Sequence, residues 1–256
     1  VGGGKTIIME SCEYCNSFLN FYPTVAVILN VEADHLDFFK DLADVQKSFR
    51  TFAQLVPDSG RVIANGDDAG TLQALEGLDK LTFGLSEQCQ VRAVNCSPDW
   101  SSFDAICAGQ PYGHFDLQVL GRHNVLNAAG VIVLADALGM DAEAAARAMA
   151  GFAGVRRRFD LVGEAAGITV VDDYAHHPTE IAATIGAASQ LGFRHVHVLF
   201  QPHRYSRVPL FTEVLKDEFG SAFDAADTVT FMDVYPAGEA PVPGVSGKTF
   251  LNVVLD

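Results

Sequence analysis

Short apolar runs alternate with helical patterns along most of the chain, and this alternation limits the possible fold more than any other feature. Residues 24–29 (TVAVIL) form a continuous apolar run, which is typical of a strand buried on both faces of a parallel sheet. A helical pattern follows this run, and the same order then recurs. The sequence therefore predicts an α/β fold with a mainly parallel sheet.

The pattern places strands at 6–9, 24–29, 61–64, 81–84, 168–171, 195–200 and 228–232, and helices at 44–55, 71–79, 124–138, 141–149, 178–191 and 209–219. Residues 90–120 differ, because short strands separated by Gly-Gln-Pro and Tyr-Gly indicate a small antiparallel part. The composition shifts at 151–158, where three arginines precede a second alternating set. We expect one domain over 1–156 and a second over 157–256.

Charge and composition exclude several classes of function. The 256 residues carry 32 acidic and 17 basic side chains, a formal net charge of −15. This balance argues against nonspecific binding to nucleic acid or to anionic membranes. No apolar run approaches the roughly 20 residues of a membrane span, and no basic-then-apolar leader opens the chain. We expect a cytoplasmic protein whose five irregularly spaced cysteines are reduced thiols.

The opening segment VGGGKT is similar to the phosphate-binding loop of ATPases. That loop needs a preceding strand, the motif Gly-x-x-x-x-Gly-Lys-Ser/Thr and a following helix. Here Gly2 and Lys5 are too close together for the four-residue spacer of the motif. The apolar run 6–9 that follows indicates a strand and not a helix. We interpret the glycines as a turn that leads into this strand.

Four polar clusters follow predicted strands or begin helices, where open α/β sheets bind ligands. The first combines Glu10 with residues 30–37 (NVEADHLD), whose oxygens and single histidine suit Mg²⁺. Acidic helix caps would give the same pattern. The second is residues 121–127 (GRHNVLN), where Asn124 and Asn127 share a helix face and an amide could pair with a purine edge. Asn124 is equally suited to cap the helix.

The other two clusters are cationic. In residues 154–159 (GVRRRF), one arginine could bind a phosphate, although a solvated basic linker has the same composition. The fourth cluster joins residues 172–180 (DDYAHHPTE) to residues 200–207 (FQPHRYSR), and Pro178 suits the first position of a helix. Two cationic segments at adjacent strand ends fit an anionic substrate better than zinc, because no third ligand has zinc spacing.

Taken in order, these stretches resemble the Mur ligase family, and within it the type that adds L-alanine. The matching segments are ESCEYCNSFL, NVEADHLDFF, GRHNVLNAAG, RRRFD, DDYAHHPTE, FQPHRYSR and DVYPAGEAP. The resemblance implies part of a central ATPase domain followed by a Rossmann-like C-terminal domain. It also implies that the chain is an inactive fragment that lacks the N-terminal UDP-binding domain and the ATP phosphate loop, and that its last domain is truncated.

The activity implied by the resemblance is ATP-dependent amide-bond formation in peptidoglycan precursor synthesis. The muramoyl carboxylate of UDP-N-acetylmuramate becomes an acyl phosphate, which the amine of L-alanine attacks. ATP and Mg²⁺ are the implied cofactors, with metal ions and arginines stabilising charge on the phosphoryl oxygens.

The resemblance also assigns roles to individual residues. Glu10 and His35 hold Mg²⁺, Asn127 meets adenine with help from His123, Asp173 binds the ATP ribose, and Arg158 approaches the γ-phosphate. His177, His203, Arg204 and Arg207 face the muramoyl carboxylate or its acyl phosphate. Two alternatives stay open: a ligase that attaches recycled murein tripeptide to UDP-muramate, and a nucleotide-binding module without catalysis.

Overall fold

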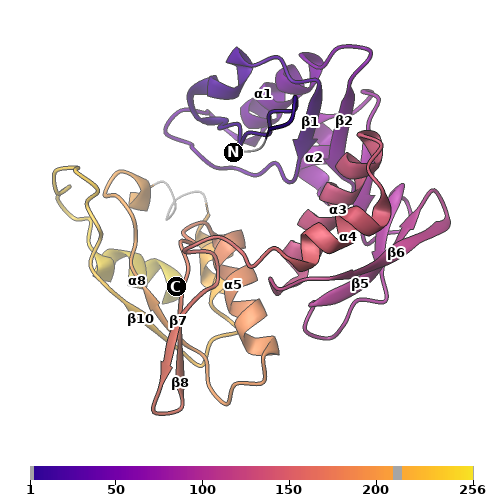
Figure 1. Ribbon diagram of the computed structural model, residues 1–256. Coiled ribbons are helices and arrows are strands. Elements are labelled where there is room, and N and C mark those ends of the chain that lie inside the picture. The colour runs from indigo at the N-terminus through magenta and orange to yellow at the C-terminus, as the bar shows by residue number, and fades with distance from the viewer. Residues whose placement is uncertain (1–2, 210–214, 256) are drawn as a thin grey trace.

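A six-stranded sheet organises the first part of the chain. The computed structural model describes residues 3–209 and 215–255 (Figure 1). The strands are β1 (Val25–Ile28), β2 (Arg61–Asn65), β3 (Leu81–Gly84), β4 (Val91–Val94), β5 (Ser102–Cys107) and β6 (Gln110–Asp116), in that spatial order. β1 to β4 are parallel, and β4, β5 and β6 are antiparallel. The predicted mainly parallel sheet with a small antiparallel part is confirmed.

The 3₁₀ segment η1 (Tyr14–Asn20) and four helices accompany this sheet: α1 (Leu42–Gln54), α2 (Ala69–Ala74), α3 (Arg122–Ala137) and α4 (Ala142–Ala150). Aspartates begin three of the helices, because Asp41, Asp68 and Asp141 each accept a hydrogen bond from a backbone N–H in the first turn. The capping carboxylates fix where each of these helices begins.

Helix α3 packs against the strands through a core of aromatic rings. Phe83, Phe103 and Phe115 are fully buried in one cluster with Val125 and Ile132 of α3. Burying one such ring contributes about 2 to 3 kcal/mol. A Cβ added at Gly130 would lie 3.2 Å from the Phe83 ring, so glycine lets the helix approach the sheet closely.

The second part of the chain contains two short sheets. The elements are β7 (Asp160–Ala165), β8 (Ile168–Asp172), α5 (Pro178–Gln190), β9 (His197–Phe200), α7 (Lys216–Ala222), β10 (Thr228–Phe231) and α8 (Gly247–Leu255). β9 and β10 are parallel, and their core includes Phe200, Phe219 and Phe250. β7 and β8 form an antiparallel hairpin that projects from this part (Figure 1).

Several predictions about elements were wrong. Residues 6–9 form no strand, and Ile7 and Ile8 are 87% and 80% exposed, because the described chain offers this run no strand to pair with. β8 pairs with β7 instead of joining the parallel strands. Gly121, at φ +97°, caps α3 in place of Asn124, because a Cβ there would lie 2.9 Å from the His123 ring.

The helix expected at 209–219 falls partly outside the described residues, and α7 covers its C-terminal part. No described helix has the length and apolar character needed to cross a membrane.

Candidate active site between the two parts of the chain

His35 lies at the centre of a group of possible metal ligands. Its Nε2 is 3.3 Å from Glu13 Oε1 and 3.7 Å from Asp34 Oδ2. One ligand atom from each of the three residues lies within 4.8 Å of the others. The Tyr14 ring packs on the imidazole with its centroid 4.7 Å away. Two carboxylates and one imidazole are therefore gathered after β1 and just before η1.

The backbone at this group is held in an unfavourable conformation. His35 has φ +52°, and Cys15 and Asn16 in η1 have φ +54° and +56°. Such left-handed conformations cost non-glycine residues free energy and persist where surrounding contacts enforce them, often at functional sites. The carbonyl of His35 accepts hydrogen bonds from the N–H groups of Phe38 and Phe39 at 2.8 and 2.9 Å. These bonds hold the backbone of the turn that carries His35.

The charges within the group stabilise one another. A hydrogen bond from His35 holds the pKa of Glu13 below its ordinary value, although burial opposes ionisation. The same hydrogen bond raises the pKa of His35. Burial raises the pKa of Asp34, but His35, His177 and Arg207 outweigh it, and the net shift is downward. Both carboxylates are thus ionised and able to hold a cation.

Contacts from the second part of the chain reach this group. The Thr179 hydroxyl donates to Glu32 Oε2 at 2.5 Å, and His177 Nδ1 lies 3.5 Å from the same oxygen. Arg207 Nη2 lies 3.3 Å from His35 Nδ1. These pairs are separated by more than 140 positions in the sequence, so the site forms only when the two parts of the chain come together.

His177 has one buried polar atom that meets no partner among the described residues. The residue precedes α5 and is only 8% exposed. Its N–H donates to Glu180 Oε2 at 3.3 Å, and its buried Nε2 has no hydrogen-bond partner within residues 3–209 and 215–255. Buried polar atoms are normally paired, and an exception needs an explanation such as a missing ligand. Here the atom is available to a bound anion or hydroxyl.

His203 and Arg204 lie on a loop that packs against Tyr235, in the segment after β10. The Arg204 N–H donates to the Tyr235 carbonyl at 2.8 Å, and the His203 ring stacks on the Tyr235 ring at 5.6 Å. Arg204 has φ +72°, another left-handed residue at the site. Burial lowers the pKa of His203, and the charges of Arg204 and Arg207 lower it further. The imidazole is therefore held neutral between two cations.

Asp173 organises the turn that carries Arg158. Its two carboxylate oxygens accept hydrogen bonds from the N–H groups of Phe159 and Ala175, both at 2.7 Å. Arg158 Nη1 lies 3.3 Å from Glu180 Oε1, while the Arg157 guanidinium lies over the Tyr174 ring at 4.5 Å. Arg158 lies over the same ring at 6.0 Å, so the two arginines share Tyr174 and differ in their carboxylates, Asp172 for Arg157 and Glu180 for Arg158.

The first turn of α3 adjoins this turn. Burial lowers the pKa of His123, the charge of Asp173 raises it and that of Arg158 lowers it. His123 Nε2 lies 3.1 Å from Asn124 Nδ2, so the ring accepts at that nitrogen from the amide. Asn127 is exposed and has no recorded hydrogen-bond partner among the described residues. Its amide is free to meet a ligand.

The structure brings His35, His177 and Arg207 together and places Glu10 elsewhere. Glu10 is exposed and outside the ligand group around His35. Three of the contacting residues received no individual role from the sequence: Glu13, Glu32 and Thr179. Glu32 and Thr179 lie within the clusters at 30–37 and 172–180. Glu13 lies three positions after Glu10 within the same quoted segment, so only the path of the chain into η1 distinguishes them.

The donor set around His35 fits a hard divalent cation. Mg²⁺ prefers oxygen ligands and retains several waters, and here two carboxylates and one imidazole are offered. Asn30 Nδ2 donates to Glu32 Oε1 at 2.9 Å, which orients a further carboxylate on the same loop. Two of the three donors are carboxylate oxygens, which are the ligands that Mg²⁺ prefers.

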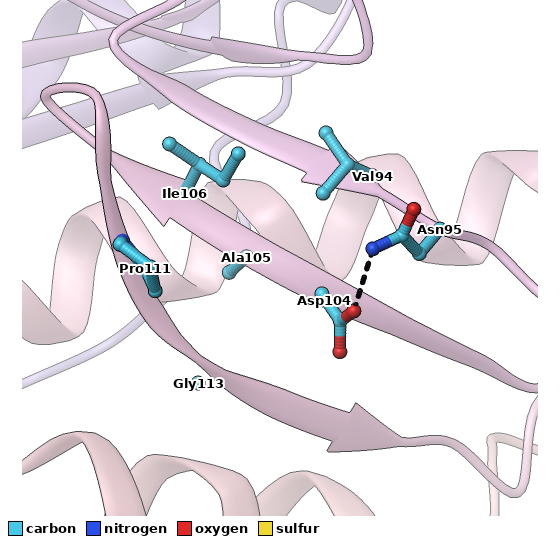
Figure 2. Close-up of a pocket in the computed structure, with 7 residues that line it drawn as sticks. All are labelled: Val94, Asn95, Asp104, Ala105, Ile106, Pro111 and Gly113. Atoms are coloured by element: carbon cyan, nitrogen blue, oxygen red, sulfur yellow. Dashed lines mark hydrogen bonds between the residues drawn. The ribbon is translucent and has the colours of Figure 1, made fainter.

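A separate hollow lies on the antiparallel part of the sheet. Figure 2 shows it between β4, β5 and β6, where Asn95 Nδ2 donates to Asp104 Oδ2 at 2.8 Å. Val94, Ile106 and Pro111 make its lining largely apolar. Because none of the predicted site residues lines it, this hollow plays no part in the candidate site.

Comparison with known proteins identifies the family of the chain. Residues 2–135 match the Mur ligase middle domain, and residues 157–253 match the Mur ligase glutamate ligase domain. The chain is 42% identical over 260 residues to the UDP-N-acetylmuramate–L-alanine ligase of Caldanaerobacter subterraneus, covering 100% of this chain and 56% of that protein. The corresponding ligase of Alkaliphilus metalliredigens is 39% identical with the same coverage.

Solved structures show the same fold. The UDP-N-acetylmuramate-alanine ligase of Thermotoga maritima has a TM-score of 0.70 and 28% identity, covering 94% of this chain and 50% of that one. A murein peptide ligase of Psychrobacter arcticus has a TM-score of 0.62 and 24% identity, covering 93% and 48%. The chain spans about half the length of the curated relatives it matches. From these matches, which run through both parts of the sequence, the chain belongs to the Mur ligase family.

Proposed function

We propose that the protein carrying this chain is a cytoplasmic ATP-dependent carbon–nitrogen ligase that joins L-alanine to UDP-N-acetylmuramate. The observation that carries the proposal is the meeting of Glu13, Asp34 and His35 with His177 and Arg207. Anionic oxygens for a cation and cationic groups for an anion are what a phosphoryl-transfer site needs. The curated relatives named for this activity support the same substrates.

In this proposal, residues 1–156 and 157–256 are two domains that divide the task. The first supplies the cation ligands at His35 and the amide of Asn127 for adenine. The second supplies Asp173 toward the ribose and Arg158 toward the γ-phosphate. The substrate carboxylate faces the remaining set: His177, His203, Arg204 and Arg207.

The geometry supports particular tasks for this last set. His177 presents a buried Nε2 with no recorded partner, which suits a hydrogen bond to an anionic oxygen. His203 is held neutral by burial and by neighbouring arginines, so it can donate or accept without adding charge. Arg207 lies beside His35 and can orient an anion next to the cation ligands.

ATP and Mg²⁺ would supply the phosphoryl group and the charge neutralisation that activate the carboxylate. Glu13, Asp34 and His35 are the residues that would hold Mg²⁺. Glu10 was predicted for this role from the sequence, and it remains the rival carboxylate.

The test measures phosphate release by the full-length protein with UDP-N-acetylmuramate, ATP and Mg²⁺, because the curated relatives are nearly twice as long as this chain. L-Alanine and the murein tripeptide are compared as acceptors. We expect turnover with L-alanine and at least tenfold less with the tripeptide. Greater turnover with the tripeptide would instead identify the recycling ligase. ATP binding without turnover on either acceptor would identify a nucleotide-binding module.

A further inference from the structure

Two histidines lie together at the amino end of β9, away from the candidate active site. His195 and His197 are two positions apart, and both are exposed. The intervening residue is fixed in the ladder, because the Val196 carbonyl accepts from the Asp227 N–H at 2.9 Å and the Val196 N–H donates to Asp227 Oδ2 at 2.7 Å. With a side-chain period of two, both imidazoles stand on one face of the strand.

Each imidazole is anchored through the same ring nitrogen. His195 Nδ1 lies 3.5 Å from Asp227 Oδ1, and His197 Nδ1 lies 2.6 Å from the Thr228 hydroxyl. An imidazole that donates from Nδ1 keeps the lone pair of Nε2, which is the metal-binding form. A carboxylate that accepts from the second nitrogen also strengthens a histidine ligand. In the tautomer with the proton on Nδ1, the carboxylate and the hydroxyl both accept, and Nε2 of each ring is the available metal ligand.

The spacing of the rings suits one ion. Their centroids are 5.9 Å apart. Two imidazoles bound to one ion through bonds of about 2.1 Å have ring centres roughly 5 to 6.5 Å apart. Small rotations about the side-chain bonds are therefore enough to bring both Nε2 atoms to a shared cation.

We propose that His195 and His197 form a two-histidine surface site for a borderline transition-metal ion such as Ni²⁺, Zn²⁺ or Cu²⁺. Two nitrogen donors select these ions over Mg²⁺, which prefers oxygen. Water completes the coordination, as at open sites. The site lies at the amino end of β9, whereas the candidate active-site residues His203 and Arg204 follow its carboxyl end. It does not depend on the proposed ligase activity.

The experiment titrates Ni²⁺ into the purified chain by calorimetry, in a His35→Gln background that removes the imidazole of the other candidate cation group. The variants are His195→Gln, His197→Gln and Asp227→Asn. His114→Gln is the matched control, because His114 also pairs with a carboxylate, Asp104 at 2.7 Å, but has no histidine two positions away. The melting temperature of each variant confirms that the exposed substitutions leave the fold intact.

Because the two ligands act together on one rigid strand, either histidine substitution should weaken Ni²⁺ binding about a hundredfold. Asp227→Asn should weaken it about tenfold through the lost orientation of His195, and His114→Gln should leave it unchanged. Acid should abolish binding, since protons compete for the same nitrogens. Unchanged binding in either histidine variant, or an equal loss in His114→Gln, would overturn the shared site.

Discussion

At the scale of single residues, two carboxylates three positions apart are alternative candidates for the metal ligand beside His35. Glu13 contacts His35, whereas Glu10 is exposed and outside the ligand group. We predict that Glu13→Gln weakens Mn²⁺ binding, used in place of Mg²⁺, by tenfold or more, on the order of the effect of losing a supporting group at a metal site. Electron paramagnetic resonance of free Mn²⁺ measures this. Glu10→Gln is the control, and a loss in Glu10→Gln alone would restore the assignment made from the sequence.

Another carboxylate, Glu239, positions the loop that carries Arg204. It accepts from the Ser206 N–H at 3.0 Å and from the Ser206 hydroxyl at 2.7 Å, and Arg204 Nη1 lies 4.0 Å away. Glu239→Gln should lower kcat/KM of the full-length ligase about tenfold, since hydrogen bonds to charged groups are worth about 1.5 to 3 kcal/mol.

Two further variants separate positioning from a general loss of stability. Glu239→Asp keeps the charge and should recover part of the activity, while the exposed Glu218→Gln in α7 should be silent. A normal kcat/KM for Glu239→Gln, or an equal loss in Glu218→Gln, would contradict a positioning role.

At the scale of elements, Asp67 ties the end of β2 to the end of β3. It accepts from the N–H groups of Leu85 at 2.6 Å and Ser86 at 3.2 Å, and from the Ser86 hydroxyl. Burial raises the pKa of Asp67, but these hydrogen bonds, led by that of Leu85, bring it below the ordinary 3.8. The folded pKa is therefore below the unfolded one, so this stabilisation is complete above about pH 4 and is lost as pH falls through the folded pKa.

Asp67→Asn should lower the free energy of unfolding by about 1 to 3 kcal/mol at pH 7. The difference from wild type should shrink below pH 4, because the wild-type carboxyl is then protonated as well. Urea unfolding at pH 7 and pH 3 measures this, with the exposed Asp58→Asn as control. A difference that grew in acid would show the opposite sign of the pKa shift.

The elements that the sequence predicted are those whose signal is local. Residues 24–29 are a continuous apolar run, and β1 forms within them. The run at 6–9 is similar but meets no partner strand in the described part of the chain, and β propensity without a ladder gives no strand. β7 was missed because its residues are mostly exposed, and its pairing with β8 alone makes it a strand. Glu13 was also not predicted from a local pattern, because the path of the folded chain, and not a sequence motif, brings it to His35.

At the scale of the whole molecule, the two parts of the chain meet at the candidate metal site itself. Glu32 contacts Thr179 and His177, and His35 contacts Arg207. A guanidinium only donates hydrogen bonds, so Nδ1 of His35 must accept from Arg207. Nε2 then carries the proton that faces Glu13, and it has no lone pair for a cation. A cation held at Nε2 would require the proton to lie on Nδ1, where it would exclude the hydrogen bond from Arg207.

This competition couples the cation to the position of Arg207. Arg207→Gln should therefore tighten Mn²⁺ binding about fivefold in the absence of substrate, the equivalent of one hydrogen bond of about 1 kcal/mol, with loss of charge repulsion acting in the same direction. The same substitution should lower ligase turnover, because the guanidinium proposed to face the substrate carboxylate is then missing. Arg156→Gln, at an exposed arginine outside the contact, is the control for net charge. Weaker Mn²⁺ binding in Arg207→Gln would mean that Arg207 supports the cation site instead of competing with it. An equal rise in Mn²⁺ affinity in Arg156→Gln would show that the effect comes only from the net charge of the protein.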